Sequence, residues 1–197
     1  MSELRNFEDY YTKEIIDGEI YYMSPGISAH LIVITRISNK FDYYFMTNNK
    51  KCSAYTEGLE VYLDGKKNKN LVVPDIAIIC DYSKFRRRGY YGVPELVVEV
   101  LSKSTSKKDR SKKFKAYQKA GVKEYWIVDI KNTSIDQYVL ENDEYDLKNT
   151  VALMDEVEFE KLTEDQKKEY TTIISPTMFD EIKIDLNEIF EKLDFVD

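Results

Sequence analysis

Two acidic residues lie inside apolar stretches of the sequence, where a carboxylate is out of place. Asp75 interrupts the apolar residues 72–79. Glu99 interrupts the apolar residues 96–101. A carboxylate buried without a partner costs several kcal/mol or takes up a proton, so each needs a compensating charge. One divalent cation would compensate both, because Mg²⁺ prefers oxygen ligands and takes one or two protein carboxylates. We therefore predict a metal site that joins two neighbouring strands.

A structural interpretation competes with the metal site, in which each carboxylate caps a loop or pairs with an arginine. Asp75 leaves both interpretations open, because it follows Pro74, where a strand can begin. Glu99 favours the metal site, because apolar residues flank it on both sides. Glu95 shares the face of Glu99 by strand alternation, but it follows a proline and is expected at the rim.

A basic segment follows these strands and carries a third candidate. Asp109, Lys113 and Tyr117 are spaced by four residues and share one face of a predicted helix. From the edge of the buried side, Lys113 could reach a carboxylate on a strand, orient or activate a water and stabilise developing negative charge. The other lysines of this helix are typical of a solvated face. As phosphate contacts, the sequence offers Lys103, Lys107, Lys108 and Arg110.

Two further residues have both a structural and a functional interpretation. His30 is the only histidine, so a histidine-rich zinc site is excluded. At the first turn of a helix it either bonds the helix end or touches phosphate at the rim of the site. Glu19 is either an exposed hairpin residue or a further acidic ligand. Two cysteines provide no disulfide framework, and Cys80 is expected to be an inert, packed thiol.

The elements that must position these residues can be read from periodicity and turn signals. We expect a hairpin around Asp17-Gly18, a helix over Ser28–Met46 and a second, basic helix. Ser104 or Thr105 would cap the basic helix and Gly121 would end it. The expected strands are residues 54–63, 71–80, 96–101, 124–129, 134–140 and 145–153, with a short strand and helix in 182–193. This order predicts a mixed α/β fold with a central sheet.

Length and charge indicate one domain of 197 residues, with a core of about 11–140 and an acidic C-terminal extension, 141–197. The net charge is −7, but the extension holds 18 of the 36 acidic residues and only 6 of the 29 basic ones. The first 140 residues are therefore net basic, and the acidic average does not exclude a DNA substrate. No apolar stretch approaches the length of a membrane span, and no signal peptide is visible, so we expect a cytoplasmic protein.

Taken together, these motifs resemble those of the bacterial putative restriction endonuclease family, a former domain of unknown function in the PD-(D/E)XK nuclease superfamily. The resemblance covers residues 11–140, and residues 184–190 more loosely. It rests on Pro94 to Thr105, Asp109-Arg110, Lys113, Tyr117 and Gly121 to Asp129, together with Asp17-Gly18-Glu19, Met23 to Pro25, His30 and Pro74-Asp75. It implies a restriction-endonuclease-like core, with a central mixed sheet flanked by helices.

The resemblance also implies roles for individual residues. Asp75 matches the metal-binding aspartate of the family, and Glu99 matches the acidic residue of the (D/E)XK element. The lysine of that element would fall at Leu101, so Lys113 is its expected replacement from the next helix. Lys103 stands where the family usually has proline, and Glu95 where it often has aspartate. Neither departure removes a proposed ligand.

The first hypothesis is an endonuclease that cleaves DNA with Mg²⁺, or with Mn²⁺. Asp75, Glu99 and the backbone carbonyl of Val100 would hold the metal, and Lys113 would position or activate the attacking water. A homodimer is expected, because cutting two strands often requires two sites. One alternative is a catalytically silent descendant that binds nucleic acid or a partner. Another is a scaffold in which the buried carboxylates bridge to lysines.

Overall fold

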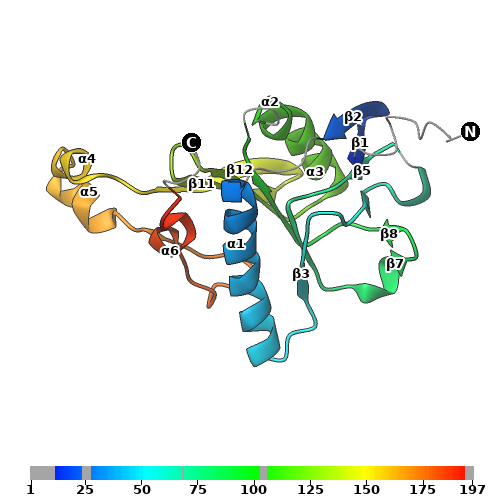
Figure 1. Ribbon diagram of the computed structural model, residues 1–197, viewed down its shortest axis with the longest axis horizontal. Coiled ribbons are helices and arrows are strands. Elements are labelled where there is room, and N and C mark those ends of the chain that lie inside the picture. Colours follow the sequence, from blue (N-terminus) through cyan, green and yellow to red (C-terminus); the bar gives the residue numbers. More distant parts are fainter. Residues whose placement is uncertain (1–11, 24–27, 68, 103–105, 194–197) are drawn as a thin grey trace, which may run out of the picture.

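The computed structural model of this protein describes residues 12–23, 28–67, 69–102 and 106–193 (Figure 1). A mixed six-stranded sheet in the order β12-β11-β10-β9-β6-β3 forms its centre, and only β9 and β10 are parallel neighbours in it. Its strands are β3 (Ser53–Thr56), β6 (Ile76–Ile79), β9 (Leu96–Val100), β10 (Glu124–Asp129), β11 (Ser134–Glu141) and β12 (Glu144–Ala152). Strands 96–101, 124–129, 134–140 and 145–153 were thus predicted to within a residue or two.

A second six-stranded sheet, in the order β2-β1-β5-β4-β8-β7, lies against the central one. It consists of the hairpin β1 (Thr12–Ile16) and β2 (Glu19–Met23) and of four two-residue strands: β4 (Val61–Tyr62), β5 (Leu71–Val72), β7 (Phe85–Arg86) and β8 (Gly89–Tyr90). The predicted hairpin is confirmed, with Asp17 and Gly18 at positive φ in its turn.

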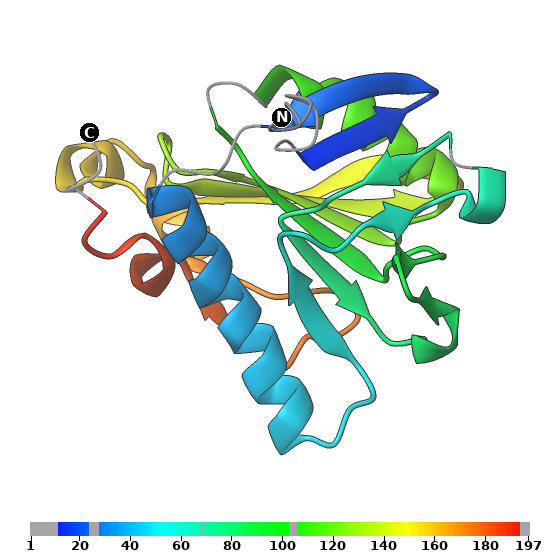
Figure 2. The same ribbon diagram turned by 45° about the vertical axis from the view of Figure 1, so that its right-hand side comes forward.

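Helices cover the two faces of the central sheet (Figures 1 and 2). The long helix α1 (Ser28–Thr47) and the short α6 (Leu186–Phe190) lie on one face, where Ile37, Phe41 and Ile189 are buried in one apolar cluster with Trp126 of the sheet. The basic helix and the second sheet lie on the other face, around a second cluster. These layers confirm the predicted α/β architecture with a central mixed sheet.

The two strands expected over residues 54–63 and 71–80 are each split, and this part of the prediction was wrong. The first becomes β3 and β4, separated by a turn in which Gly58 has a φ of 94°. The second becomes β5 and β6, separated at Pro74, which lacks the N–H that a central strand would donate. At both breaks the chain passes between the two sheets. Residues at the breaks therefore lie where the sheets meet.

The basic helix consists of α2 (Ser106–Lys108), a π-helical turn (Asp109–Lys113) and α3 (Phe114–Ala120). Its expected N-cap, Ser104 or Thr105, lies outside the described residues, and Gly121 ends it in the left-handed conformation as predicted. Asp109 and Lys113 are buried within the π turn. Such turns alter the side-chain direction within a helix and frequently occur at functional sites.

A buried carboxylate on the central sheet holds the C-terminal residues against the core. Glu124 on β10 accepts hydrogen bonds from Trp126 Nε1 at 2.7 Å, Gln137 Nε2 at 2.5 Å and the backbone N–H of Thr177 at 2.8 Å. Beyond Thr177, β14 (Ile184–Asp185) pairs with β13 (Ile173–Ile174) and leads into α6, the short strand and helix expected here. The short helices α4 (Glu156–Glu160) and α5 (Glu164–Glu169) extend away from the central sheet (Figure 1).

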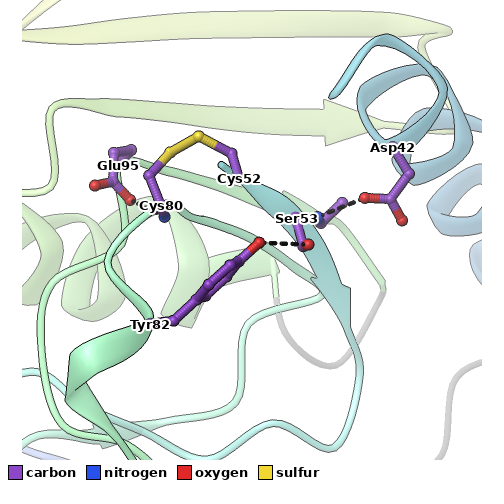
Figure 3. Close-up of a disulfide and its surroundings, with 7 residues drawn as sticks. Asp42, Cys52, Ser53, Cys80, Tyr82 and Glu95 are labelled. Carbon is purple, nitrogen blue, oxygen red and sulfur yellow. Dashed lines mark hydrogen bonds between the residues drawn. A yellow bond between two sulfur atoms is a disulfide. The ribbon is translucent and has the colours of Figure 1, made fainter. Parts of the chain in front are cut away.

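Cys52 and Cys80 form a disulfide, which corrects the expectation of an unpaired, inert thiol at Cys80 (Figure 3). The two residues flank β3 and β6, whose antiparallel register pairs Ser53 with Ile79. The register therefore places the two cysteines side by side, with a Cα–Cα distance of 4.0 Å. The N–H of Cys80 donates to the Glu95 carboxylate at 3.1 Å. Because the cysteines are distant in sequence, only strand pairing could reveal this bond.

Within the described ranges, no helix is long and apolar enough to cross a membrane.

Removing the disulfide should destabilise the fold. The bond closes a loop with a sequence separation of 28 residues. Chain-entropy arguments give a loss of roughly 3–4 kcal/mol in the free energy of unfolding for the double variant Cys52→Ser/Cys80→Ser. Urea denaturation with and without reductant measures this loss: the parent should weaken on reduction and the double variant should not respond. A parent protein insensitive to reductant would contradict the pairing.

Candidate active site

Asp75 and Glu99 are brought together by the pairing of β6 with β9. The antiparallel register places Ile76 opposite Val98. Asp75, one residue before Ile76, therefore lies across from Glu99, one residue after Val98. Asp75 Oδ2 accepts a hydrogen bond from the backbone N–H of Val100 at 2.7 Å. Both carboxylates are buried, with 6% of Asp75 and 2% of Glu99 exposed. The two strands thus position both acidic residues where the sheets meet.

The sequence placed Lys113 at the edge of the buried side of the helix, but the structure places it at the centre of the buried charges. Its side chain is buried, and Nζ lies 2.8 Å from Glu99 Oε1. Tyr117, one helical turn further, donates its hydroxyl to the same oxygen at 2.6 Å. Asp109, one turn earlier, places Oδ1 3.7 Å from Lys113 Nζ. The predicted common face of these three helix residues is confirmed, and it faces Glu99.

Glu14 is a member of this group that the sequence reading missed. Its carboxylate is fully buried and lies 2.9 Å from Lys113 Nζ. It also accepts from Lys108 Nζ at 2.6 Å and from the backbone N–H of Val73 at 3.0 Å. Strand alternation offered a signal, because Glu14 shares a face of β1 with the buried Ile16. Glu14 thereby ties the hairpin to the helix and to the strand break before Asp75.

The charges of this cluster are not balanced. Burial and the nearby carboxylates of Asp75, Asp109 and Glu14 raise the pKa of Glu99 well above its ordinary value, although Lys113 opposes them. Burial alone would lower the pKa of Lys113, but the surrounding carboxylates outweigh burial and raise it well above its usual range. Lys113 is therefore a permanent cation that can attract and orient groups but cannot accept a proton. The excess negative charge around Glu99 suits an additional cation.

A second group of metal-ligating side chains adjoins the first through Asp75. His30 Nε2 on α1 lies 3.2 Å from Asp75 Oδ1 and 3.3 Å from Glu57 Oε1. Ligand atoms of the three residues all lie within 4.8 Å of one another. The Glu57 side chain is 39% exposed, so the group opens to solvent. Burial would lower the pKa of His30, but the two carboxylates together raise it.

The donor set fits a hard divalent cation. Asp75 and Glu57 offer carboxylate oxygens, which Mg²⁺ and Mn²⁺ prefer. His30 adds a nitrogen, which Mn²⁺ tolerates better than Mg²⁺. Its Nδ1 is buried and has no hydrogen-bond partner among the residues described. Glu57 was not singled out from the sequence, because only the strand break at Gly58 brings it to Asp75.

Of the remaining sequence candidates, Lys108 contacts the buried cluster, whereas Glu19 and Arg110 pair elsewhere. Glu19 is exposed and pairs with Lys112 at 2.6 Å, away from the buried carboxylates. Lys108 faces Glu14, and Arg110 pairs with Asp129 at 3.5 Å and Asp136 at 3.0 Å. Lys103 and the side chain of Lys107 lie outside the described part of the chain. The structure thus brings His30 to the site and leaves Glu19 outside it.

Comparisons with known proteins bear on the family and the fold of this chain. Residues 2–169 match the model of the Uma2 family, described as "Putative restriction endonuclease". Over 126 residues the chain is 31% identical to the uncharacterized protein slr1290 of Synechocystis sp. (strain ATCC 27184 / PCC 6803 / Kazusa), and the match spans 64% of each chain. The crystal structure of a putative nuclease belonging to DUF820, from Anabaena variabilis ATCC 29413, has a TM-score of 0.64 with this chain. It covers 91% of this chain and 89% of that one at 16% identity, and so shows a shared fold.

Substitution of Lys113 should expose the electrostatic role of the buried cation. Lys113→Ala leaves Glu99 and Glu14 without their shared partner, which should cost roughly 3–5 kcal/mol of unfolding free energy at neutral pH. The folded-state pKa of Glu99 is already raised, and loss of Lys113 raises it further. The folded variant then binds protons more tightly than the unfolded chain, so the deficit should shrink as the pH falls from 8 to 5.

Urea denaturation of parent and variant across this pH range measures the effect. Lys115→Ala is the matched control, because Lys115 lies exposed on the same helix and should change stability by less than about 0.5 kcal/mol. A deficit for Lys113→Ala that is small, or equal at every pH, would contradict the charge assignment.

Proposed function

We propose that this chain, which belongs to the Uma2 family of putative restriction endonucleases, hydrolyses phosphodiester bonds of DNA with Mg²⁺ or Mn²⁺. The observation that carries the proposal is the meeting of Asp75, Glu99 and Lys113 at a buried junction of two sheets. A carboxylate cluster with excess negative charge, open to solvent at Glu57, suits a divalent cation and an anionic substrate.

The metal would be held by Asp75, Glu99 and the backbone carbonyl of Val100, with Glu57 and His30 as additional ligands at the exposed edge. Asp75 is oriented for this role, because one oxygen accepts from the N–H of Val100 and the other faces His30. When bound, the cation supplies the positive charge that polarises the scissile phosphate and stabilises the leaving oxygen. The protein residues supply orientation and the surrounding field.

Lys113 acts as a positioned cation in this proposal. Its pKa is raised, so it holds its proton, donates hydrogen bonds and stabilises negative charge that develops at the phosphate. Glu99 and Glu14 fix the position of Nζ between them, at 2.8 and 2.9 Å. Tyr117 holds the shared oxygen of Glu99 from the other side. The preorganised cluster therefore needs little rearrangement when negative charge appears.

The scaffold alternative draws on the same contacts. Glu99 and Glu14 do bridge to Lys113, and Lys108 adds a second bridge to Glu14. Asp75 favours catalysis over a scaffold, because its carboxylate faces a histidine and a second carboxylate instead of a lysine. A catalytically silent binding protein is the other alternative, and the retained set of Asp75, Glu99 and Lys113 weighs against it.

The proposal includes a cytoplasmic homodimer, because cleavage of both DNA strands takes two sites. Sedimentation of the purified protein tests the dimer.

The Cys52–Cys80 disulfide bears on the compartment, since reducing compartments disfavour such bonds. Thiol labelling of protein quenched directly from cells tests the compartment: two free thiols support the cytoplasm and a closed bond opposes it.

Loss of either central carboxylate should abolish cleavage while the fold persists. We expect Asp75→Asn and Glu99→Gln to lower the rate of plasmid nicking with Mg²⁺ or Mn²⁺ by roughly 100-fold or more. Glu19→Gln, at the exposed carboxylate paired with Lys112, is the matched control and should stay within about twofold of the parent. Parent-like nicking by both central variants would refute the site.

Metal binding should depend on the same residues in the absence of DNA. Titration calorimetry with Mn²⁺ should show a site that Asp75→Asn abolishes and Glu57→Gln weakens, because both carboxylates face His30. The Glu19→Gln protein should bind Mn²⁺ like the parent. Absence of Mn²⁺ and Mg²⁺ binding by the parent, with DNA binding retained, would favour the catalytically silent alternative.

A further inference from the structure

The positive charges that remain available to a ligand lie mostly off the basic helix. Six basic side chains are described on residues 106–120, and five of them pair with carboxylates: Lys108, Arg110, Lys112, Lys113 and Lys119. Only Lys115 has no such partner among the described residues. A helix whose charges are already neutralised by its own fold attracts phosphates weakly.

An open cleft of about 490 Å³ lies on the outer face of the second sheet. Lys13 of β1 lines one side, and Arg88, from the turn between β7 and β8, lines another. Gly58, Glu60 and Tyr62 also contribute to the lining. Leu71 also lines the cleft. The cleft is therefore formed by four separate segments of the chain, which the strands of the second sheet bring together.

The charge of this cleft is positive and unpaired. Lys13 and Arg88 are exposed, and neither forms an ion pair within the described ranges of the chain. Glu60 is the one carboxylate of the lining, and its Oε2 accepts the Tyr62 hydroxyl at 2.6 Å. Arg87, next to Arg88, is likewise exposed and without an ion pair among the described residues. Two cations in a concave, solvated surface suit a polyanion.

The walls of the cleft are rigidly built. The rings of Tyr62 and Tyr91 stack, with centroids 4.2 Å apart and planes 7° from parallel. The N–H of Tyr90 donates to the Glu60 carbonyl at 2.8 Å. A Cβ at Gly89 would lie 2.2 Å from that carbonyl oxygen, so only glycine allows this approach. The turn that carries Arg88 is thus held against Glu60, and a ligand would not have to order it.

The cleft and the proposed active site draw on adjoining residues of two chain segments. Gly58 in its lining directly follows Glu57, the exposed member of the group with His30 and Asp75. On β1, Lys13 faces the cleft while the next residue, Glu14, points inward to Lys113. The cleft therefore adjoins, through Gly58, the residue at the exposed edge of the proposed site.

We propose that this cleft binds the phosphodiester backbone of the nucleic-acid substrate beside the bond that is cleaved, with Lys13 and Arg88 contacting phosphates. This proposal rests on the proposed nuclease function. It assigns the positioning of the substrate to the second sheet, whereas the sequence suggested the basic helix.

The test compares Lys13→Gln/Arg88→Gln with Lys115→Gln, which removes the cation of the basic helix that has no carboxylate partner among the described side chains. Fluorescence anisotropy measures the binding of a labelled DNA duplex in chelator, at several salt concentrations, so that no cleavage occurs. The cleft variant should bind roughly tenfold more weakly at low salt, and its log–log salt slope should fall by about 1.8, or 0.9 for each lost phosphate contact. Lys115→Gln should stay within about twofold of the parent.

Equal affinity and slope for parent and cleft variant would overturn the proposal, as would a loss confined to Lys115→Gln. Thermal melting of the variants checks that the exposed substitutions leave the fold intact. A parallel nicking assay of the parent separates the two proposals. If the cleft variant binds DNA more weakly but the parent does not cleave, the proposed nuclease function is wrong and the proposed role of the cleft is supported. If the parent cleaves and the cleft variant binds DNA as the parent does, the proposed role of the cleft is wrong and the nuclease function is supported.

Discussion

The rest of the structure depends on the ion pairs that the buried ammonium group of Lys113 forms. Three carboxylates surround its Nζ, those of Glu99, Glu14 and Asp109, and they come from three different elements. Each of them would be costly to bury alone, and the shared cation makes their burial tolerable. The helix, the hairpin and the central sheet are thereby held together at one point. The same arrangement leaves several carboxylates close to Asp75, and their charge raises the pKa of Glu99.

The two breaks in the chain give this electrostatic centre its opening. At Gly58 and at Pro74 the chain leaves one sheet for the other. Glu57 and Asp75 lie at these breaks, so both carboxylates face the N-terminal part of α1 and His30. At the opposite ends of β3 and β6, the disulfide joins Cys52 to Cys80. The two strands that carry the exposed side of the site are therefore fixed at one end by a covalent bond and at the other by polar contacts.

The basic residues fall into two groups, those that pair with carboxylates of the fold and those that face solvent. On the basic helix, Arg110 and Lys112 are occupied by carboxylates of β11 and of the hairpin, and they stabilise the packing of the fold. On the second sheet, Lys13 and Arg88 lie open around a cleft. The density of basic residues along the sequence points to the helix, because counting charges does not reveal their partners. Ion pairing across the fold determines which charges remain available to phosphates.

The sequence by itself determined the first hairpin and helix, the strands expected at 96–101, 124–129, 134–140 and 145–153, the helix stop at Gly121 and the burial of Asp75 and Glu99. These follow from local periodicity, turn chemistry and the cost of placing a carboxylate among apolar neighbours. Only the tertiary structure decided that Glu14 and Glu57 join the site, that Glu19 does not, and that the cysteines pair. Those outcomes depend on strand register and on where the chain changes sheet. Alternation along β1 indicates that Glu14 is buried, but which residues of other strands it meets depends on how distant segments pack against one another.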